Sequence, residues 1–286
     1  MVATRTWPGP FRVRAGALLL LVAACAAPTP PLPAAGTAEA ARLRAAMLAE
    51  VPRAAVPPEA LAQRWIALAR AALAVEGLRP GPAELALLVD RAPAVQRVAL
   101  LLMRAEGPWE VLAAAPASTG RSGRRGYFLT PTGVFVHDGG IPGYRALGTP
   151  NAQGIRGLGA AGMRVWDFGW RHAPRGWTGD GSEAPIRFLL HATDPDVLEP
   201  RLGSPDSQGC ARIGGAMNRF LDRNGVLDAD LEPRAATDPR VGALLGPGRT
   251  PTTLAGRMLI VVDSDAPGIA SARASQPGAG GGACAA

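Results

Sequence analysis

The chain has 286 residues and is 48% hydrophobic, which suits one sizeable core with a small accessory region. Its 36 glycines and 28 prolines argue against a helical bundle and favour a loop-rich, mostly β domain. The net charge of +7 comes from arginine alone, because the sequence contains no lysine. A basic balance suits nucleic acid, an anionic membrane or an acidic cell-wall polymer. No basic run with interleaved aromatic residues marks a nucleic-acid face, so we expect no nucleic-acid partner.

The N-terminus has the pattern of an export signal. Arg5, Arg12 and Arg14 precede an apolar run, Ala15 to Ala24, that is too short to span a bilayer as a mature helix. A positive segment followed by a short apolar run is typical of a secretory signal peptide. Residues 1–25 are therefore predicted to direct export.

The apolar run ends in Val22-Ala23-Ala24-Cys25, which resembles a bacterial lipobox, where small residues precede a cysteine that becomes lipidated. On this interpretation Cys25 is the first mature residue, and its acyl chains hold the protein on a membrane surface. Ala26, rather than Asp, follows Cys25, and the usual sorting rule then favours the outer membrane. We expect a periplasmic, lipid-anchored protein; the alternative is an ordinary signal peptide with a cysteine near its cleavage site.

Short helices are predicted between this signal and the main domain. Pro28 to Pro33 is expected to form a stiff, extended spacer. Residues 37–50 and 58–77 carry apolar positions at helical spacing, and Gly77 supplies a stop. We assign residues 26–84 to a Pro/Ala-rich linker with short helices, which either stand off or pack on the main domain.

From about residue 84 the pattern changes to short apolar runs separated by turn residues, which predicts strands. A strand, a turn and a second strand are expected over 95–112, and four later runs are further strand candidates: Gly133 to His137, Met163 to Phe168, Ile186 to Leu190 and Met258 to Val262. We predict a mostly β domain over 85–264. The tail over 265–286 is low in complexity and is predicted to be disordered.

The three cysteines lie in different contexts: Cys25 at the processing site, Cys210 in the body of the domain, and Cys284 near the C-terminus. Exported proteins usually use cysteines in pairs, and a Cys210–Cys284 disulfide is possible in principle. Cys284, however, lies in a glycine-rich segment with nothing to hold it in place. We therefore expect Cys210 to be unpaired, and an unpaired cysteine in an oxidising compartment suggests catalysis.

A thiol nucleophile needs a lowered pKa, a base within reach and donors for the oxyanion that forms on attack. A helix is predicted to begin just after Cys210, with apolar residues on one face over 213–221 and Gly225 as its stop. Its positive end would favour the thiolate. Gly209 lets the backbone approach a substrate closely, and Arg212 adds a positive charge. These features predict that Cys210 is the nucleophile.

The base should be one of the three histidines. His191 follows the apolar run Ile186 to Leu190, so we expect it to project from the end of a buried strand close to Cys210. His137 also ends an apolar run, and His172 lies in a predicted loop; both are interpreted as structural. The histidines lack the short paired spacing of zinc ligands, and no cofactor is implied.

Three pieces of sequence, in order, resemble the signature of the YkuD-type L,D-transpeptidase family. They are Ser118-Thr119-Gly120, then Thr130-Pro131-Thr132-Gly133, then His191-Ala192-Thr193 followed by Ser207-Gln208-Gly209-Cys210-Ala211-Arg212. The family signature ends in Ser-His-Gly-Cys-x-Arg or Asn. The resemblance covers roughly residues 85–264, with Met258 to Val262 as the closing strand.

The resemblance implies a β-sandwich or barrel catalytic domain and a peptidoglycan L,D-transpeptidase activity. Cys210 would attack the diaminopimelyl carbonyl of a stem tetrapeptide, the terminal D-alanine would leave, and an amine acceptor would resolve the thioester. His191 would be the proton acceptor and donor. Ser207, the amides near Gly209 and Arg212 would contribute to the oxyanion hole or to substrate anchoring. The implied partners are peptidoglycan stem peptides and, through Cys25, a membrane; we expect a monomer.

Two positions depart from the family pattern. Gln208 stands where the family usually has a second histidine, and Ala192 replaces the usual glycine after the catalytic histidine. Neither removes the Cys–His pair. The same site with water as acceptor would make a hydrolase of muropeptides or of wall–lipoprotein links. A different class is a non-catalytic wall-binding lipoprotein in which Gln208 marks a decaying site.

The remaining features have structural and functional interpretations. Trp166, Phe168, Trp170 and Trp177 make an aromatic-rich segment that either packs in the core or lines a cleft. A basic loop containing Arg121, Arg124 and Arg125 either meets acidic stem peptides or is a solvated charge run. Cys210 and His191 themselves could be buried structural residues, as lone cysteines and histidines often are.

Overall fold

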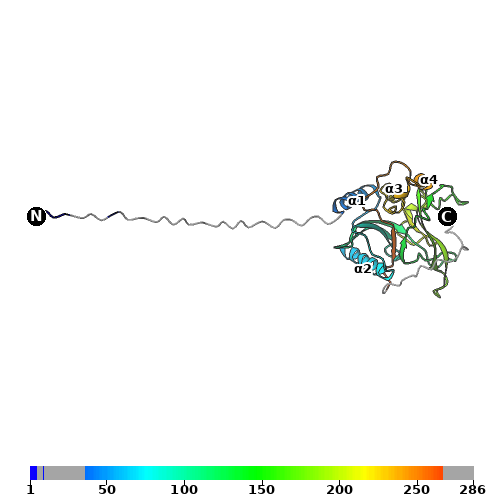
Figure 1. Ribbon diagram of the computed structural model, residues 1–286. Helices are drawn as coiled ribbons and strands as arrows, with labels where there is room; N and C mark the ends of the chain where they lie inside the picture. Colours follow the sequence, from blue (N-terminus) through cyan, green and yellow to red (C-terminus); the bar gives the residue numbers. More distant parts are fainter. Residues whose placement is uncertain (5–8, 10–35, 267–286) are drawn as a thin grey trace. The chain divides into compact units, whose positions relative to one another are not determined.

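A computed structural model of the chain describes residues 1–4, 9 and 36–266. The predicted export signal with Cys25, and the tail with Cys284, lie outside the described residues. Residues 36–266 are mostly β, as predicted (Figure 1). They are built on one curled nine-stranded sheet with the order β4-β9-β1-β2-β3-β8-β7-β6-β5. Among the described residues, no helix combines the length and apolar character needed to cross a bilayer.

The elements, in chain order, are α1 (Thr37–Glu50), α2 (Glu59–Val75), β1 (Glu84–Asp90), β2 (Arg97–Met103), β3 (Glu110–Ser118), β4 (Gly133–Val136), β5 (Tyr144–Arg145), β6 (Arg164–Pro174), β7 (Glu183–Ala192), β8 (Ala211–Ile213), α3 (Gly215–Arg223), α4 (Pro239–Leu245) and β9 (Met258–Val262). The two N-terminal helices and the strands predicted from periodicity are confirmed. Sequence reasoning did not single out β1, β5 or β8 as strands.

The two N-terminal helices cover opposite faces of the sheet (Figure 1). Leu43 and Met47 of α1 pack into the interior of the curl with Leu87 of β1. Trp65 of α2 packs on the other face, and its indole Nε1 donates to the buried Asp90 Oδ2 at 2.7 Å. Strand β1 alternates between these two cores, so its run of apolar residues is buried on both faces. The helices therefore pack on the sheet rather than stand off from it.

A short strand follows Cys210, and the helix that was predicted there begins later. Residues Ala211–Ile213 form β8, which pairs with β7 in parallel and with β3 in antiparallel register. Ala211 and Ile213 are fully buried in the core, and this alternation is what a strand requires. The helix, α3, starts at Gly215. The prediction that a helix N-terminus stands directly behind Cys210 is therefore wrong.

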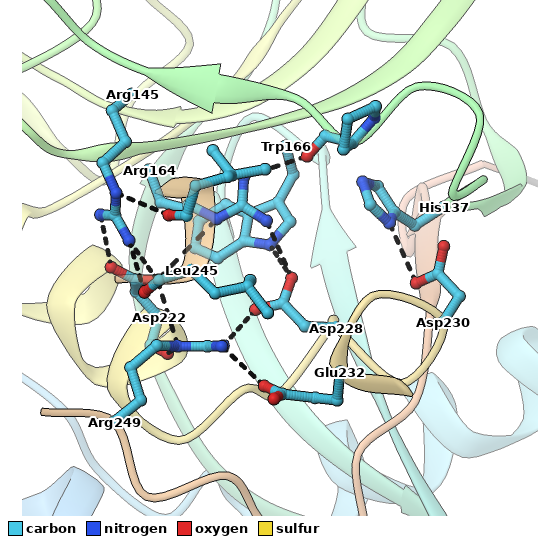
Figure 2. Close-up of polar contacts among 12 residues, drawn as sticks. His137, Arg145, Arg164, Trp166, Asp222, Asp228, Asp230, Glu232, Leu245 and Arg249 are labelled. Carbon is cyan, nitrogen blue, oxygen red and sulfur yellow. Dashed lines mark hydrogen bonds and ion pairs between the residues drawn. The ribbon is translucent and has the colours of Figure 1, made fainter. Parts of the chain in front are cut away.

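A buried charge network attaches the segment between α3 and β9 to β6 (Figure 2). Asp228, which is fully buried, accepts from Arg164 Nη2 and from Trp166 Nε1, at 3.0 and 3.2 Å, and also pairs with Arg249. Arg249 in turn contacts Glu232 at 2.6 Å. Each buried charge in this network faces an opposite charge, which offsets its loss of hydration.

The same region holds two further polar contacts. Arg145 of β5 binds Asp222 at 2.8 Å and donates to the carbonyls of Leu244 and Leu245 at the end of α4, at 2.7 and 3.0 Å. His137, fully buried after β4, lies 3.2 Å from Asp230 through its Nδ1 (Figure 2). His137 therefore has a structural carboxylate partner of its own.

Substituting Asp228→Asn should destabilise the fold strongly, because Arg164 and Arg249 would keep their charges and lose the carboxylate between them. We expect the free energy of unfolding to fall by about 3–5 kcal/mol. The exposed pair between Arg44 and Glu110, whose side chains are 38% and 41% exposed, provides the control. Urea unfolding of Glu110→Gln should change stability by less than about 1 kcal/mol. Equal effects of the two substitutions would contradict this account of the network.

Candidate active site

Cys210 ends a tight turn whose backbone is fixed by Ser207. The Ser207 side chain is fully buried; its hydroxyl donates to the Cys210 carbonyl at 2.6 Å and accepts from the Gly209 amide at 3.1 Å. Gly209 has φ +127°, and a Cβ at that position would lie 2.8 Å from the Ile186 side chain. The turn therefore requires glycine at 209, and Ser207 satisfies polar groups that would otherwise be buried without partners.

The other two motifs of the sequence signature converge on this turn. The Thr119 carbonyl accepts from the amides of Asp206 and Ser207, at 3.0 and 2.9 Å. Thr130 Oγ1 donates to the Gly209 carbonyl at 2.8 Å and accepts from the Gly120 amide at 2.8 Å. Segments that are far apart in the sequence thus hold the 206–210 turn on two sides. The role of Thr130 as a clamp on Gly209 was not predicted from the sequence.

The pairing of β7 with β8 places Cys210 and His191 on one face of the sheet. His191 is the register partner of Arg212, and Leu190 that of Ala211. Ala211 faces the main core, so Cys210 and Arg212, one residue to either side, face the opposite side, as His191 does. Cys210 packs against Leu189, which lies two residues before His191 on β7 and therefore on the same face of that strand.

Cys210 is buried, and its sulfur contacts a backbone carbonyl and takes part in a disulfide. Cys210 is 2% exposed and packs with Ala146, Val165 and Leu189, and its Sγ lies 3.7 Å from the Arg187 carbonyl. The structure has Cys210 in a disulfide. The expectation that Cys210 is unpaired is therefore wrong. Two thiols that can meet in an oxidising compartment will pair, so nucleophilic chemistry at Cys210 requires its reduced form.

His191 is held as a neutral, oriented ring. Its Nδ1 lies 2.6 Å from the Ala192 carbonyl, which can only accept, so Nδ1 carries the proton and Nε2 is the proton-accepting nitrogen. Burial and, to a lesser extent, the positive charge of Arg212 lower the pKa of His191 from 6.5 to about 4, against the opposing effect of the hydrogen bond to Ala192. The ring is therefore neutral at neutral pH.

Arg212 is mostly buried on the same face. Its burial lowers the pKa of the guanidinium, while the nearby Asp206 and Tyr127 oppose the shift. As the register partner of His191, Arg212 places a fixed positive charge beside the ring. This charge disfavours imidazolium and would stabilise a thiolate or an oxyanion formed on the same face.

Two expectations about the site change with the structure. The Gly209 amide, predicted as an oxyanion donor, is bonded to Ser207 Oγ, so this N–H is not directed at a substrate position. The helix dipole predicted to activate Cys210 is replaced by the turn and strand described above. Positive charge near the thiol instead comes from Arg212. His172 lies on β6 opposite Pro185, away from the pairing that joins Cys210 and His191.

The aromatic segment divides between core and site. Trp166 and Phe168 are buried in the core. Trp170 lines a small pocket of about 100 Å³, together with Asp167, Arg171 and Arg187. Arg187 binds Asp167 at 2.8 Å. Arg187 links this pocket to Cys210, because its carbonyl lies 3.7 Å from the Cys210 sulfur. The charged lining of the pocket was not predicted from the sequence.

The comparisons with known proteins give no family assignment. No protein-family model matches the chain, and no curated protein sequence matches it. Within the described part of the chain, no three His, Cys, Asp or Glu side chains gather in a group that would hold a metal ion. The functional argument therefore rests on the residues and their geometry.

The low pKa of His191 makes folding stability depend on pH. Between its ordinary pKa of 6.5 and the folded value of about 4, the unfolded chain binds more protons at this ring, so stability falls as pH falls. The shift corresponds to a loss of about 3 kcal/mol over this window. Urea unfolding at pH 7 and pH 4 should show a smaller loss for His191→Asn than for the parent.

His172→Asn is the matched control, because His172 is partly exposed and lies on β6, whereas His191 is buried on β7. We expect this variant to keep the full pH dependence of the parent. Identical pH dependences for His191→Asn and the parent would contradict the buried, neutral state of His191.

Gly120→Ala should disrupt the 206–210 turn. A Cβ at Gly120 would lie 2.0 Å from the Phe128 carbonyl oxygen and 2.6 Å from the Thr130 amide, both of them backbone atoms. The clash must displace Thr130 from Gly209, and we expect a loss of at least about 2 kcal/mol in thermal or urea unfolding. Gly81→Ala, which meets no atom within 4 Å, is the control and should be near neutral. A Gly120→Ala protein as stable as the parent would show that the turn tolerates the change.

Proposed function

We propose that this chain is a cysteine acyltransferase that acts on peptidoglycan stem peptides as an L,D-transpeptidase. The observation that carries the proposal is that Cys210, directly before β8, packs against Leu189 of β7, two residues before His191 on the same face of that strand. The convergence of three sequence motifs on the turn before Cys210 supports it. Hydrogen bonds involving Thr119, Thr130 and Ser207 fix this turn. A cysteine that serves only in core packing would not require such a fixed turn.

In the first step, the Cys210 thiol gives its proton to His191 Nε2, and the sulfur attacks the carbonyl carbon of a stem tetrapeptide. A C–S bond forms, the C–N bond to the terminal D-alanine breaks, and the proton moves from His191 to the leaving amine. In the second step, an acceptor amine attacks the thioester carbonyl carbon and gives a proton to His191. A C–N bond forms, the C–S bond breaks, and the proton passes from His191 to the departing sulfur, which restores the Cys210 thiol. Each step is balanced in atoms and charge without a cofactor.

The described residues suit these steps in three ways. The hydrogen bond from Nδ1 to the Ala192 carbonyl leaves Nε2 of the neutral His191 ring as the accepting nitrogen, although burial and Arg212 disfavour the imidazolium that proton transfer forms. Arg212 supplies positive charge where negative charge would develop on sulfur or oxygen. Rotation about χ1 of Cys210, once the disulfide is reduced, lets Sγ move between staggered positions on the face that His191 shares.

The same proposal places the protein in the periplasm, anchored by a lipid on Cys25. Its support is the lipobox-like sequence that ends at Cys25. Labelling with a radioactive fatty acid should mark the parent and fail with Cys25→Ser. Labelling that persists in that variant would exclude Cys25 as the anchor.

The activity is tested with reduced protein and a tetrapeptide donor that ends in D-alanine. Intact-mass spectrometry should detect a thioester on the parent, and Cys210→Ala should abolish it together with new cross-links. Cys284→Ser, which removes a different cysteine, is the control and in the reduced state should acylate like the parent. His191→Gln should slow acylation by about 10²–10⁴-fold.

The acceptor is settled in the same assay by comparing products with and without an amine. Cross-linked product from the parent supports transpeptidation, whereas free tripeptide formed equally in the presence of amine identifies a hydrolase. Cross-linking that persists unchanged in Cys210→Ala would overturn the mechanism. Failure of every donor to acylate reduced Cys210 would point to a non-catalytic wall-binding protein.

A further inference from the structure

Five arginines surround the turn that carries Cys210, and we call them the arginine rim: Arg121, Arg124, Arg125, Arg175 and Arg201. All five are exposed. Three come from the 120–130 loop, and the other two come from separate segments that contact this loop or the turn. Sequence order alone does not indicate that they form one surface.

The 120–130 loop is fixed to the turn by backbone hydrogen bonds. The Arg121 amide donates to the Ser207 carbonyl at 3.0 Å, and the Phe128 amide donates to the Gln208 carbonyl at 3.4 Å. The loop thus begins and ends against the residues that precede Cys210. Its middle, which holds Arg124 and Arg125, is exposed.

The loop between β6 and β7 adds Arg175. Phe128 and Arg175 form an isolated bridge, and the Gly123 amide donates to the Gly176 carbonyl at 2.7 Å. The Trp177 ring packs edge-on against Phe128, with 5.1 Å between the ring centres. Arg175 is therefore held beside the 120–130 loop.

Asp206 shows how two members of the rim hold a carboxylate. Its side chain lies 2.9 Å from Arg201 and 3.9 Å from Arg121, so one acid in the turn serves two guanidinium groups. Guanidinium forks match carboxylate oxygens geometrically, which suits them to this contact. Arg124 lies over the Tyr127 ring, at 4.5 Å from its centre.

The rest of the rim is not engaged in ion pairs with described acids. Arg124, Arg125 and Arg175 make no ion pair with any described residue. The acid in the neighbouring loop, Asp180, accepts from the Ser182 amide at 2.9 Å within its own turn. Hydrogen bonds from Thr178 and Ser182 keep the pKa of Asp180 low, so that it stays ionised there.

We propose that the arginine rim binds the free carboxylates of a peptide substrate and so selects acidic over amidated stem peptides. This inference rests on the proposed function for its choice of peptide over other polyanions. A thiol that forms an acyl-enzyme needs a carbonyl with a leaving group, which peptides supply and nucleic acids do not. The rim lies beside the turn that carries this thiol, where such a peptide would extend.

Binding is measured by calorimetry on the full chain carrying Cys210→Ala, so that no turnover occurs. The probes are a stem tetrapeptide with free carboxylates and the same peptide with its carboxylates amidated. We expect the acidic peptide to bind more tightly, with an affinity that falls as salt rises. Arg125→Gln and Arg175→Gln should each weaken its binding by up to about fivefold, and the triple variant with Arg124→Gln by about tenfold or more. None of these changes should affect the amidated peptide.

Arg79→Gln is the matched control. Arg79 is exposed, has no ion pair among the described residues and lies in the turn after α2, so its loss changes the net charge equally. We expect no change in binding of either peptide. Equal weakening by Arg79→Gln would mean that net charge, rather than the rim, attracts the peptide.

The inference is overturned if the parent binds both peptides equally or if the rim variants bind the acidic peptide like the parent. It is also overturned if the rim variants lose binding only to phosphatidylglycerol vesicles, which would make the rim a membrane-facing surface. Rim-dependent binding without acylation of reduced Cys210 would reject the proposed function and keep the rim. Acylation of reduced Cys210 by the parent, with rim variants that bind the acidic peptide like the parent, would keep the proposed function and reject the role of the rim.

Discussion

The three-residue strand β8 joins the two halves of the sheet, and the site depends on it. On one side, β8 pairs with β3 through Ala117 and Ser118; on the other, it pairs in parallel with β7. The strands from β4 to β3 and those from β7 to β5 meet only through β8 in the sheet order. Because Cys210 directly precedes β8 and His191 lies on β7, the pairing that closes the sheet also brings these two residues to one face.

So short a strand needs support from the segments around it. Ala211 and Ile213 are buried in the main core, which fixes the register, since a slip by one residue would turn them out of it. The turn before β8 is held by Thr119, Thr130 and Ser207, which satisfy its buried backbone groups. The rigidity of the turn therefore comes from side chains and backbone remote in sequence. This is the arrangement expected where a reactive group must be held in place.

Charge is distributed differently in the buried network around Asp228 and around the Cys210 turn. Buried arginines such as Arg164 are matched by acids in a closed network (Figure 2). Around the Cys210 turn, arginines are exposed and outnumber the acid that they share, Asp206. Full matching stabilises the fold, whereas unmatched exposed charge contributes little to stability and is available to a ligand. The buried network and the exposed rim both use arginine, so the two groups cannot be told apart by residue type and differ in their burial.

Much of the fold could be predicted from local patterns, because periodicity directly reflects which face of an element is buried. The helical spacing over 37–50 and the apolar runs of β2, β7 and β9 gave these elements correctly. The pairing of Cys210 with His191 as candidates also came from the sequence, from their motif and from the strand that precedes His191. These inferences needed only residues that are neighbours along the chain.

The tertiary structure decided what depends on contacts between distant segments. A three-residue run such as Ala211–Ile213 has no period of its own, so the sequence favoured the following helix, and pairing with β3 and β7 made it a strand. The disulfide state of Cys210, the bond between Ser207 and the Gly209 amide, and the clamp from Thr130 likewise follow from three-dimensional proximity. The sequence by itself determined which residues are the candidates for the proposed chemistry. The fold determined how they are held, because hydrogen bonds and burial across the sheet are set only when the strands have paired.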